Sequence, residues 1–162
     1  VASARDVSGD GFDHDGVAPA FPLHPQTYRF RGGSGGIASA SAPDADVIVE
    51  SDIYAGGLVT WGGDLNSDGY DDLVTSSQTS EYQGVAYVFH GAAEGLTATH
   101  VADADTAISG DAGQSRFGLA MAAGDLDGDG YRDLALGAPL LSINNKQIYI
   151  TYFGTPAGAG LT

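Results

Sequence analysis

Residues 125–135 read Asp125-Leu126-Asp127-Gly128-Asp129-Gly130-Tyr131-Arg132-Asp133-Leu134-Ala135, an acidic stretch interrupted by glycine that ends in apolar residues. A second copy begins 61 residues earlier, is identical at seven of the eleven positions and reads Asp64-Leu65-Asn66-Ser67-Asp68-Gly69-Tyr70-Asp71-Asp72-Leu73-Val74. A shorter copy begins 58 residues before the second and reads Asp6-Val7-Ser8-Gly9-Asp10-Gly11-Phe12-Asp13-His14. An internal repeat of about 60 residues therefore organises the chain.

A second motif follows each acidic stretch in the same order. Its copies are Tyr28-Arg29-Phe30-Arg31-Gly32, Tyr87-Val88-Phe89-His90-Gly91 and Ile150-Thr151-Tyr152-Phe153-Gly154. The segments around both motifs are short and rich in β-branched and aromatic residues, which favours strands, whereas 25 Gly would weaken helices. Each repeat offers about four short strands, the unit of a propeller blade. We therefore predict an all-β fold in a single region, residues 1–162, with approximate repeats 1–51, 52–113 and 114–162.

The charge of the 162-residue chain excludes several functions. Its 21 acidic and 6 basic residues give a net charge of −15, which disfavours binding to nucleic acid and to anionic lipid. Thiolate metal sites and disulfides are excluded because there is no Cys. No apolar run approaches the roughly 20 residues of a membrane helix, so we expect no membrane insertion. The 21 acidic residues are 18 Asp and 3 Glu, and the short Asp side chain suits turns and sites for hard cations.

The motifs resemble the FG-GAP repeats of the integrin α-chain β-propeller. In that family a Phe-Gly pair opens a strand, an Asp-rich calcium loop follows, and Gly-Ala-Pro closes the next strand. The third repeat contains all three parts: Phe117-Gly118, the loop from Asp125 to Asp133, and Gly137-Ala138-Pro139. The resemblance implies an integrin-like β-propeller segment of about three four-stranded blades.

The first two repeats depart from this pattern. The second keeps Gly57 and the loop but has Ser76-Ser77-Gln78 where Gly-Ala-Pro is expected. The first keeps Ala18-Pro19 and has Asp15-Gly16 at the apolar start of a strand. Family propellers usually close with about seven blades, and propellers in general with about four to eight, so three cannot close a ring. We expect completion either by a second copy, giving a six-bladed homodimer, or by the remainder of a longer chain.

The acidic loops have the ligand pattern of a calcium site. Ca²⁺ takes about six to eight oxygen ligands, which a tight loop supplies from alternate positions. The side chains at loop positions 1, 3, 5 and 9 and the backbone carbonyl at position 7 are the candidates. They are Asp125, Asp127, Asp129, Tyr131 and Asp133 in the third loop, Asp64, Asn66, Asp68, Tyr70 and Asp72 in the second, and Asp6, Ser8, Asp10 and Phe12 in the first.

The closing position of the first loop is His14, which is a poor ligand for a hard cation. Asp13 or Asp15 could substitute there. An EF-hand would need Glu at position 12 of each loop, where the chain has Val17, Thr75 and Leu136. Three bound Ca²⁺ ions would add +6 and reduce the net charge from −15 to −9, so we predict calcium-dependent folding.

A ligand-binding face is less sharply defined by the sequence. Trp61 is the only Trp and could stack on a sugar or pack near the propeller axis. The resemblance places Glu81, Tyr82 and Asn145 in loops on the face that contacts ligands in integrin-type propellers. No nucleophile and base occur together in a known catalytic motif, and we expect no enzyme activity.

The combined interpretation is a calcium-binding, extracellular or cell-surface module for interaction or adhesion, with a protein or carbohydrate ligand. Ca²⁺ would have a structural role in it. One alternative is a calcium-stabilised lectin-type propeller that binds carbohydrate. Another is a non-catalytic propeller segment of a larger secreted enzyme.

Overall fold

A computed structural model describes residues 2–3, 6, 8–17, 26–35, 41–51, 58–78, 84–110, 116–143 and 146–152. This part of the chain is built from strands, and its helical segments are the short 3-10 turns η1 (Ala42–Asp44) and η2 (Val101–Asp103). The strands are β1 (Ala2–Ser3), β2 (Asp15–Val17), β3 (Gln26–Phe30), β4 (Val47–Glu50), β5 (Val59–Gly63), β6 (Asp72–Gln78), β7 (Gly84–Phe89), β8 (Thr106–Ser109), β9 (Ala120–Gly124), β10 (Asp133–Ile143) and β11 (Lys146–Tyr152).

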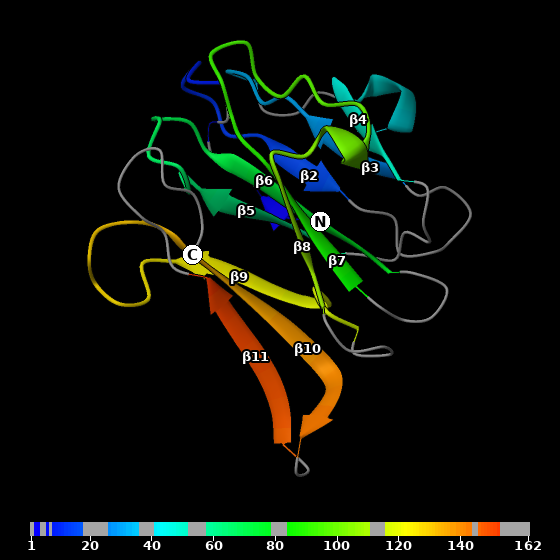
Figure 1. The fold of residues 1–162 in the computed structure, drawn as a ribbon. Coiled ribbons are helices and arrows are strands. Elements are labelled where there is room, and N and C mark those ends of the chain that lie inside the picture. Colours follow the sequence, from blue (N-terminus) through cyan, green and yellow to red (C-terminus); the bar gives the residue numbers. More distant parts are fainter. Residues whose placement is uncertain are drawn as a thin grey trace.

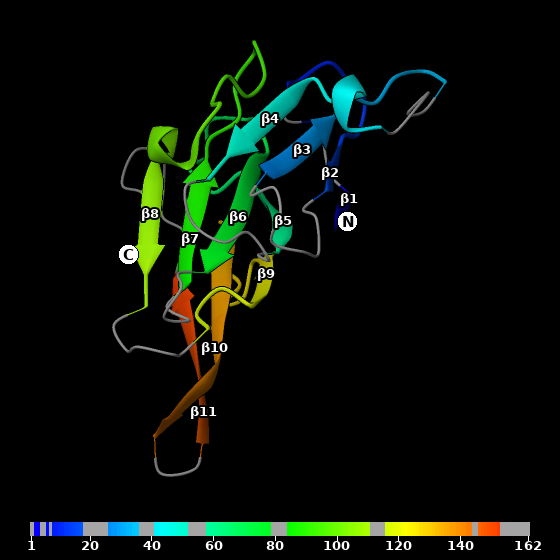
Figure 2. The same cartoon turned by 90° about the vertical axis from the view of Figure 1, so that its right-hand side faces the viewer.

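The strands form three antiparallel sheets in chain order, which we call blades 1, 2 and 3 (Figures 1 and 2). Blade 1 is β1-β2-β3-β4, blade 2 is β5-β6-β7-β8, and blade 3 is β9-β10-β11. Consecutive strands pair through the whole of each blade, which is the meander expected for a propeller unit. The predicted all-β fold is therefore confirmed, and blade 3 has three strands among the described residues.

The first strand of each blade faces the first strand of the next. Strand β5 contacts β9 on one side and β1 on the other. This is the arrangement of inner strands around a propeller axis, with the later strands of each blade lying farther out. Three blades therefore form one arc rather than a closed ring.

The central strand β6 shows how the blades hold together. Residues Asp72 to Ser77 are all buried, although a strand in an open sheet buries only alternate residues. Leu73 belongs to a cluster with Val49 of blade 1, and Val74 belongs to another with Leu134 and Leu136 of blade 3. Blade 2 is thus covered on both faces, one by each neighbour.

Polar side chains of β6 also form hydrogen bonds to the neighbouring blades. The hydroxyl of Thr75 lies 3.0 Å from that of Thr27, and the hydroxyl of Ser77 lies 3.1 Å from that of Ser51. On the other face, the Ser76 hydroxyl donates to the Gly118 carbonyl at 2.8 Å. The Ser76-Ser77-Gln78 segment, which replaces Gly-Ala-Pro, therefore provides buried hydrogen bonds to both neighbours.

The Phe117-Gly118 pair joins blade 3 to blade 2. The Phe117 side chain is fully buried in the cluster that includes Val74 and Leu136. Its carbonyl accepts a hydrogen bond from the Gln78 amide at 3.0 Å. Gly118 has a φ of +78°, and a Cβ there would lie 2.9 Å from the Cβ of Ser76. Glycine is required because this turn is left-handed and presses against the neighbouring blade.

Strand β10 is longer than the sequence predicts. Gly137-Ala138-Pro139 was expected to close a strand, but β10 continues past Pro139 to Ile143. The pairing with β11 shifts register between Ala138 and Ser142, which is where the ladder accommodates a proline. Strands β10 and β11 form a long hairpin that extends beyond the other blades (Figure 1).

Replacing Gly84 by alanine tests the contact between blades 2 and 3. A Cβ at Gly84 would lie 1.7 Å from the Phe117 carbonyl oxygen, so the two blades must separate. We expect Gly84→Ala to lower the free energy of unfolding by about 2 kcal/mol or more, measured by urea denaturation. Gly33→Ala is the matched control, because nothing lies within 4 Å of its Cβ position, and its effect should stay within about 0.5 kcal/mol. Equal effects of the two variants would refute the contact.

Candidate metal-binding loops

The three acidic stretches occupy the same place in each blade, between the first strand and the second. We call residues 6–14 loop 1, 64–72 loop 2 and 125–133 loop 3. Strands β5 and β9 both point to the left-hand side of the molecule in Figure 1, where loops 2 and 3 begin. Since the inner strands lie side by side, the loops are brought to one end of the blades.

Each loop is shaped by its own carboxylates. In loop 2 the carboxylate of Asp64 accepts hydrogen bonds from the amides of Asp68 and Gly69, both at 2.9 Å. The corresponding Asp6 accepts from Asp10 and Gly11, at 3.0 and 2.6 Å.

Loop 3 has a related arrangement, in which the amides of positions 4 and 6 replace those of positions 5 and 6. Asp125 accepts from Gly128 and Gly130 at 2.7 and 3.1 Å. The carboxylate at position 5 of each loop accepts from the amide two residues later, as Asp129 does from Tyr131 at 2.9 Å. These Asx-type bonds hold the acidic side chains of the loops close to the backbone turn.

The side chain at position 9 of each loop is completely buried. Asp72, Asp133 and His14 all have zero exposure. Asp72 accepts from the amide of Leu65 at 2.7 Å and from the amide of Gly91 at 2.9 Å, and Asp133 accepts from Leu126 at 2.6 Å. The closing aspartates therefore anchor the start of loops 2 and 3 to their blades.

The carboxylates gather differently in the three loops. In loop 3, Asp125, Asp127 and Asp133 place one oxygen each within 4.8 Å of the others. In loop 1, Asp6 and Asp10 gather in the same way with His14, a residue that the sequence analysis had set aside as a poor ligand. Within the described residues, Asp64, Asp68 and Asp72 of loop 2 form no such group. The Asn66 amide there donates to Asp68 at 2.8 Å instead.

The remaining candidates of loop 1 are also placed by the structure. The Ser8 side chain is 6% exposed, and Phe12 is exposed while its amide donates to the Asp10 carboxylate at 3.0 Å. Asp13, one of the two suggested substitutes for His14, is exposed. Asp15, the other, is the first residue of β2.

Neighbouring loops touch one another. A Cβ at Gly9 of loop 1 would lie 3.0 Å from the ring of Tyr70 in loop 2, and one at Gly63 would lie 3.0 Å from the guanidinium of Arg132 in loop 3. Loops 1 and 2 enclose a cleft of about 440 Å³ lined by Asp6, Gly9, Asp13, Gly69 and Asp71.

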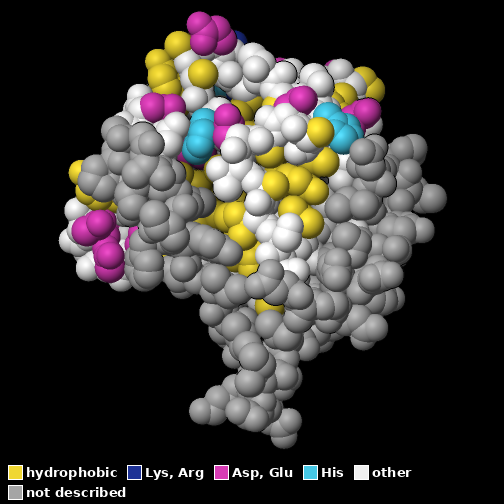
Figure 3. Space-filling view, viewed as in Figure 1, with side chains coloured by type: hydrophobic (Ala, Val, Ile, Leu, Met, Phe, Trp, Pro, Cys, Tyr) yellow, Lys and Arg dark blue, Asp and Glu magenta, His cyan; other side chains and the backbone are white. Residues whose placement is uncertain are grey.

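Two titratable groups near the loops have shifted pKa values. Partial burial raises the pKa of Asp6, but the hydrogen bonds from Gly11, Asp10, Ser8 and Gly9 more than offset this and hold it below its ordinary value. The pKa of His90 is raised, chiefly by the Asp72 carboxylate that lies 3.3 Å from its Nδ1. The shift of His90 reflects the carboxylates around it, whereas that of Asp6 reflects the backbone amides that the turn aims at its carboxylate. Asp and Glu side chains are also spread over the face shown in Figure 3, where almost no Lys or Arg is visible.

The suggested ligand-contact residues are only partly described. Trp61 lies on β5, is partly buried, and packs against the cluster that includes Val59 and Leu73. A Cβ at Gly16 of β2 would lie 3.4 Å from its indole ring. Trp61 thus contributes to the packing between blades 1 and 2. Glu81, Tyr82 and Asn145 lie outside the described residues.

Comparison with known proteins places this architecture in a family. The profile of the FG-GAP repeat matches residues 117–160, and that of an FG-GAP-like repeat matches residues 64–136. The chain belongs to the FG-GAP repeat family, and its three blades form a segment of an integrin-like β-propeller.

The chain is similar to integrin α subunits and to a phospholipase. It is 36% identical over 93 residues to integrin alpha-PS2 of Drosophila melanogaster and 37% identical over 79 residues to integrin alpha pat-2 of Caenorhabditis briggsae. These matches cover 54% and 47% of the chain. It is 30% identical over 142 residues, 80% of the chain, to phosphatidylinositol-glycan-specific phospholipase D of Bos taurus. The matched regions span only 6% of each integrin subunit and 17% of the phospholipase.

Replacing Asp72 by asparagine tests the anchoring role of position 9. Asparagine has a single acceptor oxygen, so one of the two buried amides that Asp72 satisfies would lose its partner. We expect Asp72→Asn to lower the free energy of unfolding by about 1–3 kcal/mol in the presence of chelator, measured by urea denaturation. Glu94→Gln removes the same charge from an exposed turn and should change stability by less than about 0.5 kcal/mol. An Asp72→Asn variant as stable as this control would contradict the anchoring role.

Proposed function

We propose that this chain is a calcium-stabilised part of an extracellular or cell-surface propeller that takes part in protein interaction or adhesion. Loop 3 carries the proposal, because it gathers three carboxylates, two exposed and one buried, between the first two strands of a blade. The donor set is entirely oxygen, which suits a hard cation such as Ca²⁺. Asp125, Asp127, Asp129, Asp133 and the carbonyl of Tyr131 would hold the ion.

The bound ion would have a structural role. It would neutralise carboxylates that repel one another and so hold the loop between β9 and β10 in one conformation. Loop 2 offers Asp64, Asn66 and Asp68 for the same purpose, with the carbonyl of Tyr70 and with Asp72. Weak sites of this type, with dissociation constants of about 10⁻⁴–10⁻³ M, match the calcium concentration outside cells.

We further propose that the chain itself has no catalytic role. No nucleophile and base stand together in a catalytic motif in its sequence. The similarity to phosphatidylinositol-glycan-specific phospholipase D over 80% of the chain favours a second candidate function, a non-catalytic propeller segment within a larger secreted enzyme. A carbohydrate ligand has less support, because Trp61 packs between two blades.

The described residues include no helix of the length and apolar character that a membrane crossing requires. The relatives are much longer than the matched region, which favours completion of the ring by other parts of a longer polypeptide rather than by a second copy. A protein partner is the ligand class that the similarity to integrin α subunits favours.

Thermal unfolding with and without calcium tests the metal role. At a calcium concentration 10 to 100 times the dissociation constant, each occupied site contributes about 1.4–2.7 kcal/mol, so Tm should rise by several degrees over its value in chelator. Asp127→Ala removes one of the gathered carboxylates and should reduce this rise, whereas Glu94→Ala should leave it unchanged. A Tm that chelation does not alter would sink the proposal.

Sedimentation equilibrium tests how the ring is completed. We expect the isolated 162-residue chain to remain a monomer both in calcium and in chelator, because its missing blades would come from a longer polypeptide. A dimer that forms only with calcium would instead show that two copies complete a six-bladed ring.

A further inference from the structure

His14 is a buried polar side chain without a partner. It has zero exposure, and neither Nδ1 nor Nε2 has a hydrogen-bond partner among the described residues. Buried polar groups in folded proteins are almost always paired, and an unpaired imidazole carries two such atoms. The position is the one that Asp72 and Asp133 fill in the other loops, where their carboxylates accept backbone amides. The ring nitrogens of His14 therefore lack the backbone partners that satisfy the carboxylates of Asp72 and Asp133, and a bound ion would supply the missing partner.

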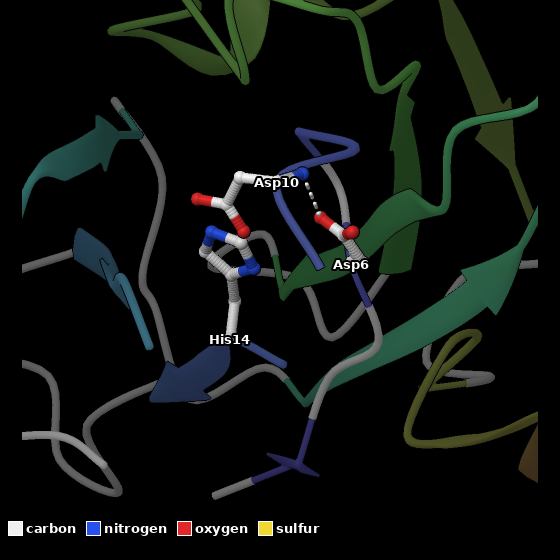
Figure 4. A group of neighbouring side chains, drawn as sticks. All are labelled: Asp6, Asp10 and His14. Atoms are coloured by element: carbon white, nitrogen blue, oxygen red, sulfur yellow. Dashed lines mark hydrogen bonds between the residues drawn. The ribbon is translucent and has the colours of Figure 1, made fainter. Parts of the chain in front are cut away.

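The imidazole points into an anionic cluster. One nitrogen of His14 and one oxygen each of Asp6 and Asp10 lie within 4.8 Å of one another. In Figure 4 the ring rises from the segment just before β2 toward both carboxylates. Asp6 also accepts from the amide of Asp10 at 3.0 Å, so the turn of loop 1 keeps the two acidic residues together. Small side-chain rotations would bring all three donors to one cation.

We propose that loop 1 binds a divalent transition-metal ion of the Zn²⁺ class, with His14, Asp6 and Asp10 as ligands. Imidazole nitrogen suits Zn²⁺ and other first-row transition metals, whereas Ca²⁺ and Mg²⁺ take oxygen. One imidazole and two carboxylates, with solvent at the remaining position, form a normal ligand set for Zn²⁺. Loop 1 would thus select a different cation from loops 2 and 3. The proposal does not depend on calcium binding in either of them.

Three further features in and around loop 1 are compatible with a bound ion. The Ser8 hydroxyl, at loop position 3, is also buried and has no partner among the described residues. The cleft between loops 1 and 2 includes Asp6 and opens to solvent, which gives an ion access and leaves room for a coordinating water. Arg31 lies 3.3 Å from Asp10 and is half-exposed, so it can move away when a cation replaces it.

A bound ion would also have a structural consequence. Blade 1 begins with a strand of two residues and a strand of three, which are joined by loop 1. Such short strands provide few ladder hydrogen bonds. A metal that joins both sides of the turn would hold β1 and β2 in register.

The test is a Zn²⁺ titration of the whole chain in about 10 mM Ca²⁺, an excess that would fill loops 2 and 3 if they bind calcium with the affinity proposed above. Ring nitrogen signals of the four His are followed by NMR, and Zn²⁺ affinity is measured by competition with a chromophoric chelator. We expect the His14 nitrogens to shift at one equivalent of Zn²⁺. The variant His14→Asp should bind Zn²⁺ at least tenfold more weakly, because it restores an all-oxygen loop.

Control variants separate the ligands from general attraction to negative charge. Glu94→Gln removes a carboxylate from an exposed turn outside loop 1 and its cleft, and it should change Zn²⁺ affinity by less than twofold. Asp10→Asn, at an exposed position, provides a second ligand variant if His14→Asp does not fold, and it should also weaken binding at least tenfold. The proposal is overturned if the His14 signals do not respond to Zn²⁺, if excess Ca²⁺ displaces the ion, or if Glu94→Gln weakens binding as much as Asp10→Asn.

Discussion

Face-to-face packing between blades is the interaction on which the rest of this molecule depends. A four-stranded sheet cannot bury its own faces, and β6 is buried on both only because blades 1 and 3 cover it. Leu73 and Val74 place apolar contacts on the two faces of the strand, one toward each neighbouring blade. The hydroxyl pairs of Thr75 and Ser77 and the bond from Ser76 satisfy the polar groups that this packing would otherwise bury unpaired.

The same packing creates the loop end of the molecule. Because the inner strands β1, β5 and β9 are neighbours, the loops that follow them are neighbours too, and Tyr70 and Arg132 pack against glycines of the adjacent loop and blade. The residue at position 9 is buried since it begins, or immediately precedes, the second strand of the blade. The chemistry of each loop is therefore decided by one buried side chain, which is a carboxylate in two loops and an imidazole in the third.

Much of this architecture could be predicted from the repeat of the Asp-Gly motif and of the Tyr-x-Phe-x-Gly motif. Their spacing and order predict blades of about four short strands, and the structure confirms this fold class. The continuation of β10 past Pro139 could not be predicted, because it depends on the irregular pairing with β11. The role of Ser76-Ser77-Gln78 was also missed, since hydrogen bonds to Ser51, Phe117 and Gly118 involve residues far away in the sequence. The only available signal was that three polar residues stand where the family pattern has Gly-Ala-Pro.

By itself, the sequence determined the period of the repeat, the strand-forming segments and the acidic composition of three loops, because these depend on local residue type and spacing. Only the tertiary structure decided which donors meet. It gathered Asp125, Asp127 and Asp133 in loop 3, separated the carboxylates of loop 2, and placed His14 beside Asp6 and Asp10. The physical reason is burial: whether a side chain at the end of a loop is enclosed, and with which partners, depends on how neighbouring blades pack against it.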